Sequence, residues 1–223
     1  MKPEKLWVIS REKNTRLILA LDKELPLLTL DRLEPYLCGI KIGLSLFLEG
    51  KIDYIKELIK KYKNTVYMLA DVKLADIPEI VSLNLRLLGN IGFDGAITHL
   101  FQGGIHRVKK ETDLIGIILM SHSEASRLEF FLRDMVKEGE DAGLDGFIVG
   151  FSKLKMFRNI TRERTTVLTP GIGVQGGKYG EGLKEGADFE IVGRSIVNSE
   201  DPLKETLKIV KAERRALGQS FTS

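Results

Sequence analysis

The chain has 223 residues, 43% of them hydrophobic, which is enough to bury one large core. Its 34 basic and 31 acidic side chains give a net charge of +3, and the pI near 8.8 weakly favours an anionic small ligand. Nucleic-acid binding would need clustered basic and aromatic residues, so we expect no nucleic-acid partner. One cysteine and three histidines offer neither an internal disulfide nor a zinc site. No apolar run could span a membrane and the N-terminus lacks a signal-peptide core, so we expect a cytoplasmic protein without a membrane partner.

Short apolar strands alternate along the chain with amphipathic segments of helical length, and no linker or composition shift interrupts them. Eight strands joined by helical crossovers predict a (β/α)8 TIM barrel of the α/β class, whereas six or seven would favour an open sheet. We expect one domain over residues 1–223, with an N-terminal extension at 1–14 and a frayed tail at 219–223. The predicted strands are 17–22, 39–43, 66–73, 95–98, 115–120, 146–149, 166–168 and 189–192, and the clearest predicted helices are 53–62, 79–91, 123–138 and 202–217.

The ends of these strands carry polar residues that would meet at one mouth of the barrel, where active sites of this fold lie. Any one polar strand end can simply mark where the chain returns to water. Lys41 is harder to explain in that way, because Ile40 and Ile42 leave it pointing into the barrel. Asp71 and Lys73 lie two apart, so an extended strand places them on one face as a pair. In chain order the strand ends are Asp22, Lys41, Asp71 with Lys73, His99, Ser121, Gly150, Pro170, and Gly193 with Arg194.

Two glycine-rich segments, 170–177 and 192–196, follow the seventh and eighth predicted strands. Loops at these positions commonly hold phosphate through backbone N–H groups, and glycine permits the close approach. Arg194 adds a guanidinium fork that matches phosphate geometry. A glycine loop alone could be only a flexible turn, but together with Arg194 it indicates a phosphorylated small molecule as ligand.

The ordered set of motifs resembles the orotidine 5'-phosphate decarboxylase family, whose reaction makes UMP in pyrimidine biosynthesis. The Asp-x-Lys-x-x-Asp motif is shared with related phosphosugar barrels, so the full set in order carries the resemblance. The matching pieces are 19–22, 40–43, Asp71-x-Lys73-x-x-Asp76-Ile77-Pro78, Met120-Ser121-His122, 170–177 and 192–194.

The resemblance implies a cofactor-free and metal-free decarboxylase, active as a homodimer with its sites at the interface. In that scheme Lys73 protonates C6, Asp71 lies beside the substrate carboxylate, and Lys41 neighbours Asp71 in a chain of alternating charges. Asp76 would reach the site of the other subunit. The implied substrate contacts are Asp22 with ribose, Ser121 and Gln175 with the pyrimidine, and Pro170, Gln175, Gly193 and Arg194 on the phosphate side.

The sequence departs from the family pattern at Ile80, where a threonine often reaches the partner's ribose, and around Ser123 and 44–45. None of these departures removes a charged position. The glycine-rich segment 171–180 is expected to act as a mobile lid. Two alternatives stay open: a magnesium-dependent enzyme for hexulose- or gulonate-type sugar phosphates, and a catalytically silent barrel that senses a nucleotide or sugar phosphate. The magnesium enzymes usually carry glutamate at the position of Lys41.

Overall fold

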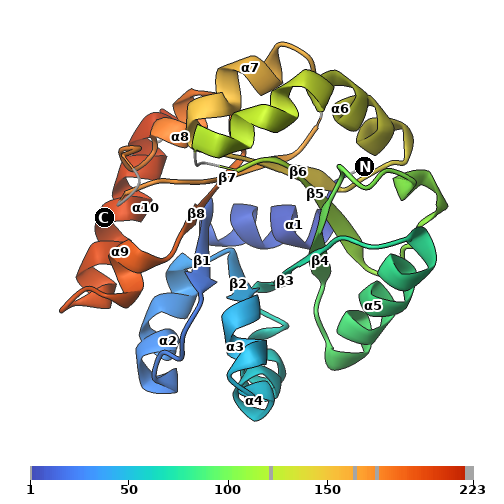
Figure 1. Cartoon of the computed structure of the whole chain (residues 1–223). Helices are drawn as coiled ribbons and strands as arrows, with labels where there is room; N and C mark the ends of the chain where they lie inside the picture. Colours follow the sequence, from blue (N-terminus) through green and yellow to red (C-terminus); the bar gives the residue numbers. More distant parts are fainter. Residues whose placement is uncertain (1, 121–122, 163–164, 174–175, 219–223) are drawn as a thin grey trace.

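The computed structural model describes residues 2–120, 123–162, 165–173 and 176–218. Within them, eight parallel strands pair in sequential order and close into a barrel, because β1 also pairs with β8 (Figure 1). The predicted barrel is therefore confirmed; three strands have the predicted bounds, and those of the other five differ by one or two residues. The strands are β1 (Leu17–Leu21), β2 (Gly39–Gly43), β3 (Tyr67–Leu74), β4 (Gly95–His99), β5 (Asp113–Leu119), β6 (Gly146–Val149), β7 (Val167–Pro170) and β8 (Phe189–Val192).

Helices surround the barrel and cover the outer faces of the strands (Figure 1). The helix from Pro202 begins as predicted, with the Asp201 side chain accepting the backbone N–H of Lys204. The α-helices are α1 (Glu4–Lys13), α2 (Leu27–Leu33), α3 (Leu44–Leu48), α4 (Ile52–Tyr62), α5 (Pro78–Ile91), α6 (Leu132–Asp141), α7 (Leu154–Arg158), α8 (Glu181–Lys184), α9 (Arg194–Val197) and α10 (Pro202–Ala216). Short 3-10 segments are η1 (Glu34–Tyr36), η2 (Ile105–Arg107), η3 (Ser123–Phe131) and η4 (Phe151–Lys153).

The predicted helix 123–138 is wrong in its first half, which is the 3-10 segment η3; the α-helix α6 begins only at Leu132. The buried residues of α6 recur at helical spacing from Leu132 through Met135 and Val136 to Gly139. Just before them, Phe130 and Phe131 are exposed, so their rings do not pack against the barrel. The apolar residues of the segment therefore do not form one continuous helical stripe.

The core has two parts, one between the strands and the outer helices and one inside the barrel. The segment predicted as an N-terminal extension contains α1, which lies across the barrel interior in Figure 1. Its Leu6 and Ile9 pack into the inner cluster, and the Trp7 ring lies 5.0 Å from that of Phe189. Helix α1 thus covers apolar side chains inside the barrel, so the segment is part of the fold. The tail 219–223 lies outside the described residues.

Candidate active site

A cavity of about 330 Å³ opens at the C-terminal ends of the strands. Its volume lies at the lower end of the range for small-molecule sites. The polar lining groups come from several strands, as the fold predicts. The lining residues are Ala20, Asp22, Lys41, Asp71, Lys73, Ile117, Met120, Ile148, Pro170, Gly171, Ile172, Ile191, Gly193, Arg194 and Ser195.

Lys41 reaches the cavity from the middle of β2, and its side chain is only 10% exposed. The flanking Ile40 and Ile42 pack on the other face of the strand, into the outer core. The Lys41 ammonium lies 2.5 Å from Asp71 Oδ2 and 3.8 Å from Asp22 Oδ1. A buried ammonium needs such partners, and here it has one carboxylate on each side.

Asp71 and Lys73 meet as expected, with Lys73 Nζ 2.8 Å from Asp71 Oδ1. The strand that carries them is not regular, and the two side chains differ in burial. The Asp71 side chain is 10% exposed but that of Lys73 is 43% exposed. The pairing of β3 with β4 shifts register between Ala70 and Leu74, and Lys73 has a left-handed backbone with φ of 48°. This conformation is uncommon for a residue with a side chain, so the contact depends on an irregularity in the strand.

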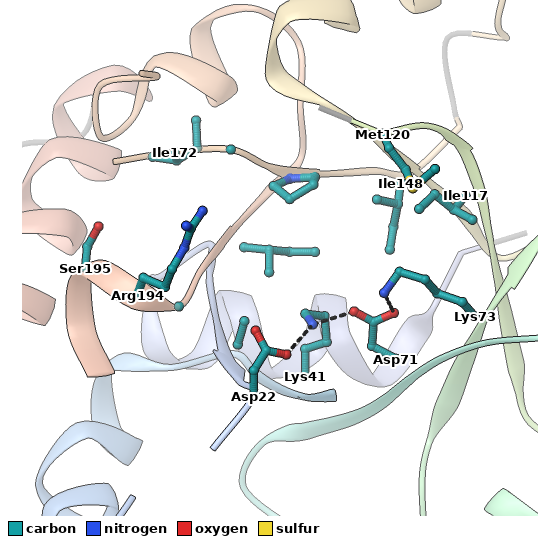
Figure 2. A pocket seen from close by; sticks show the side chains of 15 residues that line it. Asp22, Lys41, Asp71, Lys73, Ile117, Met120, Ile148, Ile172, Arg194 and Ser195 are labelled. Atoms are coloured by element: carbon teal, nitrogen blue, oxygen red, sulfur yellow. Dashed lines mark hydrogen bonds and ion pairs between the residues drawn. The ribbon is translucent and has the colours of Figure 1, made fainter. Parts of the chain in front are cut away.

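The resulting chain of charges alternates in sign: Asp22, Lys41, Asp71 and Lys73 (Figure 2). Burial alone would raise the pKa of Asp71, but the ammonium groups of Lys41 and Lys73 outweigh it and hold that pKa below its ordinary value. Asp71 is therefore a carboxylate at neutral pH. It fixes the Lys73 ammonium from one side while the rest of that group faces the cavity, where a positive charge and a proton can serve a developing anion.

Arg194 and Ser195 lie at the opposite end of the cavity from Lys73 (Figure 2). Arg194 is exposed, and among the described residues no carboxylate forms an ion pair with it. The backbone at Gly193 approaches β1 so closely that a Cβ there would lie 3.0 Å from the carbonyl oxygen of Ala20. This end of the cavity thus combines an available guanidinium with unshielded backbone, which suits an anionic group such as phosphate.

The cavity brings together seven of the predicted site residues. Asp76 does not line it; this exposed residue accepts the backbone N–H of Ile77 at the start of α5. The half-buried His99 also lies outside the lining, and burial, together with the Lys73 charge, lowers its pKa. Ser121 and Gln175 lie outside the described residues, as does part of the segment expected to be a lid. The seven are Asp22, Lys41, Asp71, Lys73, Pro170, Gly193 and Arg194.

The sequence reasoning missed the apolar wall of the cavity and Ser195. The apolar wall could have been found from the sequence, because side chains two residues apart in a strand share a face. Stepping back two positions from the predicted strand ends at 22, 150 and 193 leads to Ala20, Ile148 and Ile191, which all line the cavity. These side chains provide an apolar surface against which a planar ring can pack.

Neither a metal site nor a membrane span emerges from the described part of the chain. There, no group of three or more His, Cys, Asp or Glu side chains is placed to hold a metal ion. None of the described helices is long and apolar enough to cross a membrane.

Comparison with known proteins gives the same family by sequence and by structure. Residues 15–209 match the model of the orotidine 5'-phosphate decarboxylase / HUMPS family. Orotidine 5'-phosphate decarboxylase of Methanococcoides burtonii is 35% identical, covering 89% of this chain and 97% of that protein. The enzyme of Sulfurisphaera tokodaii is 32% identical, covering 88% and 94%. The crystal structure of the enzyme from Sulfolobus solfataricus superimposes with a TM-score of 0.82 at 32% identity, covering 91% and 99% of the two chains. The chain therefore belongs to the orotidine 5'-phosphate decarboxylase / HUMPS family.

Proposed function

We propose that this chain is an orotidine 5'-phosphate decarboxylase, which converts orotidine 5'-phosphate to UMP and CO2 in pyrimidine biosynthesis. The observation that carries the proposal is the alternating charge chain that ends at Lys73, with Arg194 at the far end of the same cavity. A substrate with a phosphate at one end and a carboxylate at the other fits this polarity. The relatives compared above have the same activity in their names.

In the proposed mechanism, Arg194, Gly193 and Pro170 hold the phosphate end, and Asp22 contacts the ribose. Ser121 and Gln175 are assigned to the pyrimidine. This arrangement directs the substrate carboxylate toward Asp71. The bond between C6 and the carboxylate breaks, CO2 leaves, and the electron pair stays on C6. Lys73 stabilises that charge and gives its proton to C6, and binding energy from the distant phosphate supports the step.

The magnesium-dependent sugar-phosphate alternative deserves comparison because the matched family description also includes HUMPS. Magnesium prefers oxygen ligands, several of them carboxylates. Here Lys41 places an ammonium 2.5 Å from Asp71, where a cation would be repelled. Lys41 therefore favours the decarboxylase, and the complete set of charges favours catalysis over a silent phosphate sensor.

We further propose that the chain, as one domain, forms a cytoplasmic homodimer in which Asp76 enters the partner's site. Asp76 is exposed and does not line the cavity of its own chain. Beside it, α5 and the residue that precedes the helix present exposed apolar side chains at helical spacing, a surface that suits a second copy. These side chains are Ile77, Ile80, Leu83 and Leu87. The isoleucine at 80 would pack in this interface but could not hydrogen-bond to ribose.

Mixing two inactive variants tests the shared site. If Asp76 acts across the interface, co-refolded Lys73→Ala and Asp76→Ala chains form mixed dimers with one intact site, and about one quarter of wild-type activity returns. If Asp76 acts within its own chain, no activity is regained, and if it has no role, Asp76→Ala is active on its own; either result contradicts the proposal. Glu79→Ala, which removes an exposed acid at the start of α5, should stay active and serves as the control.

The activity itself is tested by following the ultraviolet absorbance of orotidine 5'-phosphate with purified protein in EDTA. Rapid conversion to UMP, abolished by Lys73→Ala but not by Lys56→Ala on the exposed face of α4, would support the proposal. Absence of turnover by the wild-type protein would refute it. Turnover of hexulose phosphates on adding Mg²⁺ would then identify the sugar-phosphate enzyme, and phosphate-ligand binding without turnover the silent barrel.

A further inference from the structure

Glu190 is a fully buried carboxylate in the middle of β8. Its neighbour Ile191 lines the cavity, so Glu190 faces the opposite way, toward the outer helices. In a parallel barrel, whose strands are covered on both faces, such a position is normally apolar. Burying a carboxylate there is costly unless hydrogen bonds satisfy it. Glu190 therefore needs an explanation that packing does not supply.

In the described part of the structure, the hydrogen bonds of the Glu190 side chain go to the segment by which the loop after β7 returns to the barrel. Oε2 accepts the backbone N–H of Gly180 at 2.9 Å, and Oε1 accepts that of Gly182 at 2.8 Å. Burial raises the pKa of Glu190 to about 7, while the N–H groups of Gly180, Gly182 and Leu183 act against that rise by favouring the charged form. The carboxylate thus binds this segment through hydrogen bonds to both of its oxygens.

This segment fits tightly between β8 and α10. Gly180 has a left-handed backbone with φ of 77°, and a Cβ there would lie 2.6 Å from the carbonyl oxygen of Ala212 in α10. A Cβ at Gly182 would lie 2.9 Å from Glu190 Oε1. With no room for side chains at these two positions, the backbone can lie directly against the carboxylate.

Tyr179 ties the same segment to the phosphate end of the cavity. Its hydroxyl donates to Glu205 Oε1 of α10 at 2.7 Å, and Ser195 lies near the same tyrosine, since both would crowd a Cβ placed at Gly173. Ser195 lines the cavity next to Arg194 (Figure 2). Tyr179 also lies close to Gly173, since a Cβ at Gly173 would lie 3.1 Å from the tyrosine ring. The loop after β7 is therefore connected to the Arg194 side of the site at its returning end.

We propose that Glu190 is a positioning residue for the substrate's phosphate: it clamps the N–H groups of Gly180 and Gly182 and so fixes the loop after β7 relative to Gly193 and Arg194, with Tyr179 as a second tie. This role rests on the proposed decarboxylase function, because it concerns the phosphate of that substrate. It assigns a buried side chain outside the cavity to phosphate affinity rather than to the chemical step.

The test compares Glu190→Gln with wild type on orotidine 5'-phosphate and on orotidine, which lacks the phosphate. An amide offers one acceptor oxygen instead of two, so one of the N–H groups loses its partner. We expect KM for the phosphorylated substrate and the inhibition constant of inorganic phosphate to rise about tenfold, with kcat changed less than threefold. The kcat/KM for orotidine should be unchanged. Tyr179→Phe should shift KM in the same direction by a smaller factor.

Glu213→Gln is the matched control, because it makes the same change at another fully buried glutamate, which contacts Thr15 and Arg16 instead of the loop. It should leave KM and phosphate inhibition at wild-type values. The proposal is overturned if folded Glu190→Gln and Tyr179→Phe retain wild-type KM and phosphate inhibition, or if Glu190→Gln loses activity equally on both substrates. If Glu190→Gln does not fold, the KM and the phosphate inhibition of Tyr179→Phe test the proposal in its place. If wild type turns over neither substrate, the proposed function fails, and calorimetric binding of inorganic phosphate to wild type and variants decides on the clamp separately.

Discussion

The buried carboxyl of Glu213 predicts that the protein loses stability as the pH rises. Glu213 lies on α10 and is fully buried; Oε2 accepts from the backbone N–H of Arg16 at 3.0 Å and from Thr15 Oγ1 at 3.3 Å. Within the described part of the structure, Oε1 has no hydrogen-bond partner. Burial, with the charge of Glu190 as the next cause, raises the pKa of Glu213 from 4.5 to about 8.

The sign of the effect follows from proton binding. The folded protein holds this proton more tightly than the unfolded chain, so the contribution to stability is complete below pH 4.5 and is lost as the pH rises to about 8. At about 1.4 kcal/mol for each pH unit, the loss approaches about 5 kcal/mol. That is a large part of the total stability of an ordinary domain.

Glu213→Gln should remove most of this dependence, because the amide oxygen can accept from Arg16 and Thr15 while the side chain stays neutral. Urea unfolding at about pH 5 and about pH 9 gives the free energy of unfolding at each end of the window. We expect wild type and the exposed-site control Glu57→Gln to lose several kcal/mol more between the two than Glu213→Gln does. The variant keeps the loss that comes from Glu190, whose pKa is also raised, to about 7. Equal losses in wild type and Glu213→Gln would refute the reasoning.

Three further variants test the cavity. Arg194→Ala should raise KM by about 10- to 100-fold in steady-state kinetics, with a smaller effect on kcat, because it removes a charge-assisted contact to phosphate. Gly43→Ala should raise KM several-fold, since the added methyl would collide with Asp22 Oδ1 and displace that carboxylate; an unchanged KM would show that the side chain moves without consequence. Asp71→Asn should lower the free energy of urea unfolding by about 2–4 kcal/mol, because it leaves the buried Lys41 ammonium with only the more distant Asp22 carboxylate, and Lys41→Met added to it should recover most of that loss.

The sequence was sufficient to predict the barrel, because each strand is a short apolar run and polar residues mark where most of the strands end. The same ends identified Asp22, Lys41 and Arg194, which the structure brings to one cavity. The role of Glu190 could not be foreseen, since it depends on two glycines eight and ten residues earlier in the chain whose N–H groups turn toward it. The pattern of apolar and polar residues predicts which face a side chain occupies, but not which backbone groups approach it.

Lys73 shows how a correct expectation can have a different physical cause. Strand alternation predicted that it would share a face with Asp71, yet the register shift and the left-handed backbone at Lys73 bring the two groups together. Sequence gives little warning of this conformation, which glycine and asparagine adopt far more readily than lysine. Its energetic cost, about 1–2 kcal/mol, has a functional counterpart. A regular, fully buried pair would enclose the ammonium, whereas the irregular strand leaves Lys73 bonded to Asp71 on one side and open to the cavity on the other, as protonation of a substrate carbon requires.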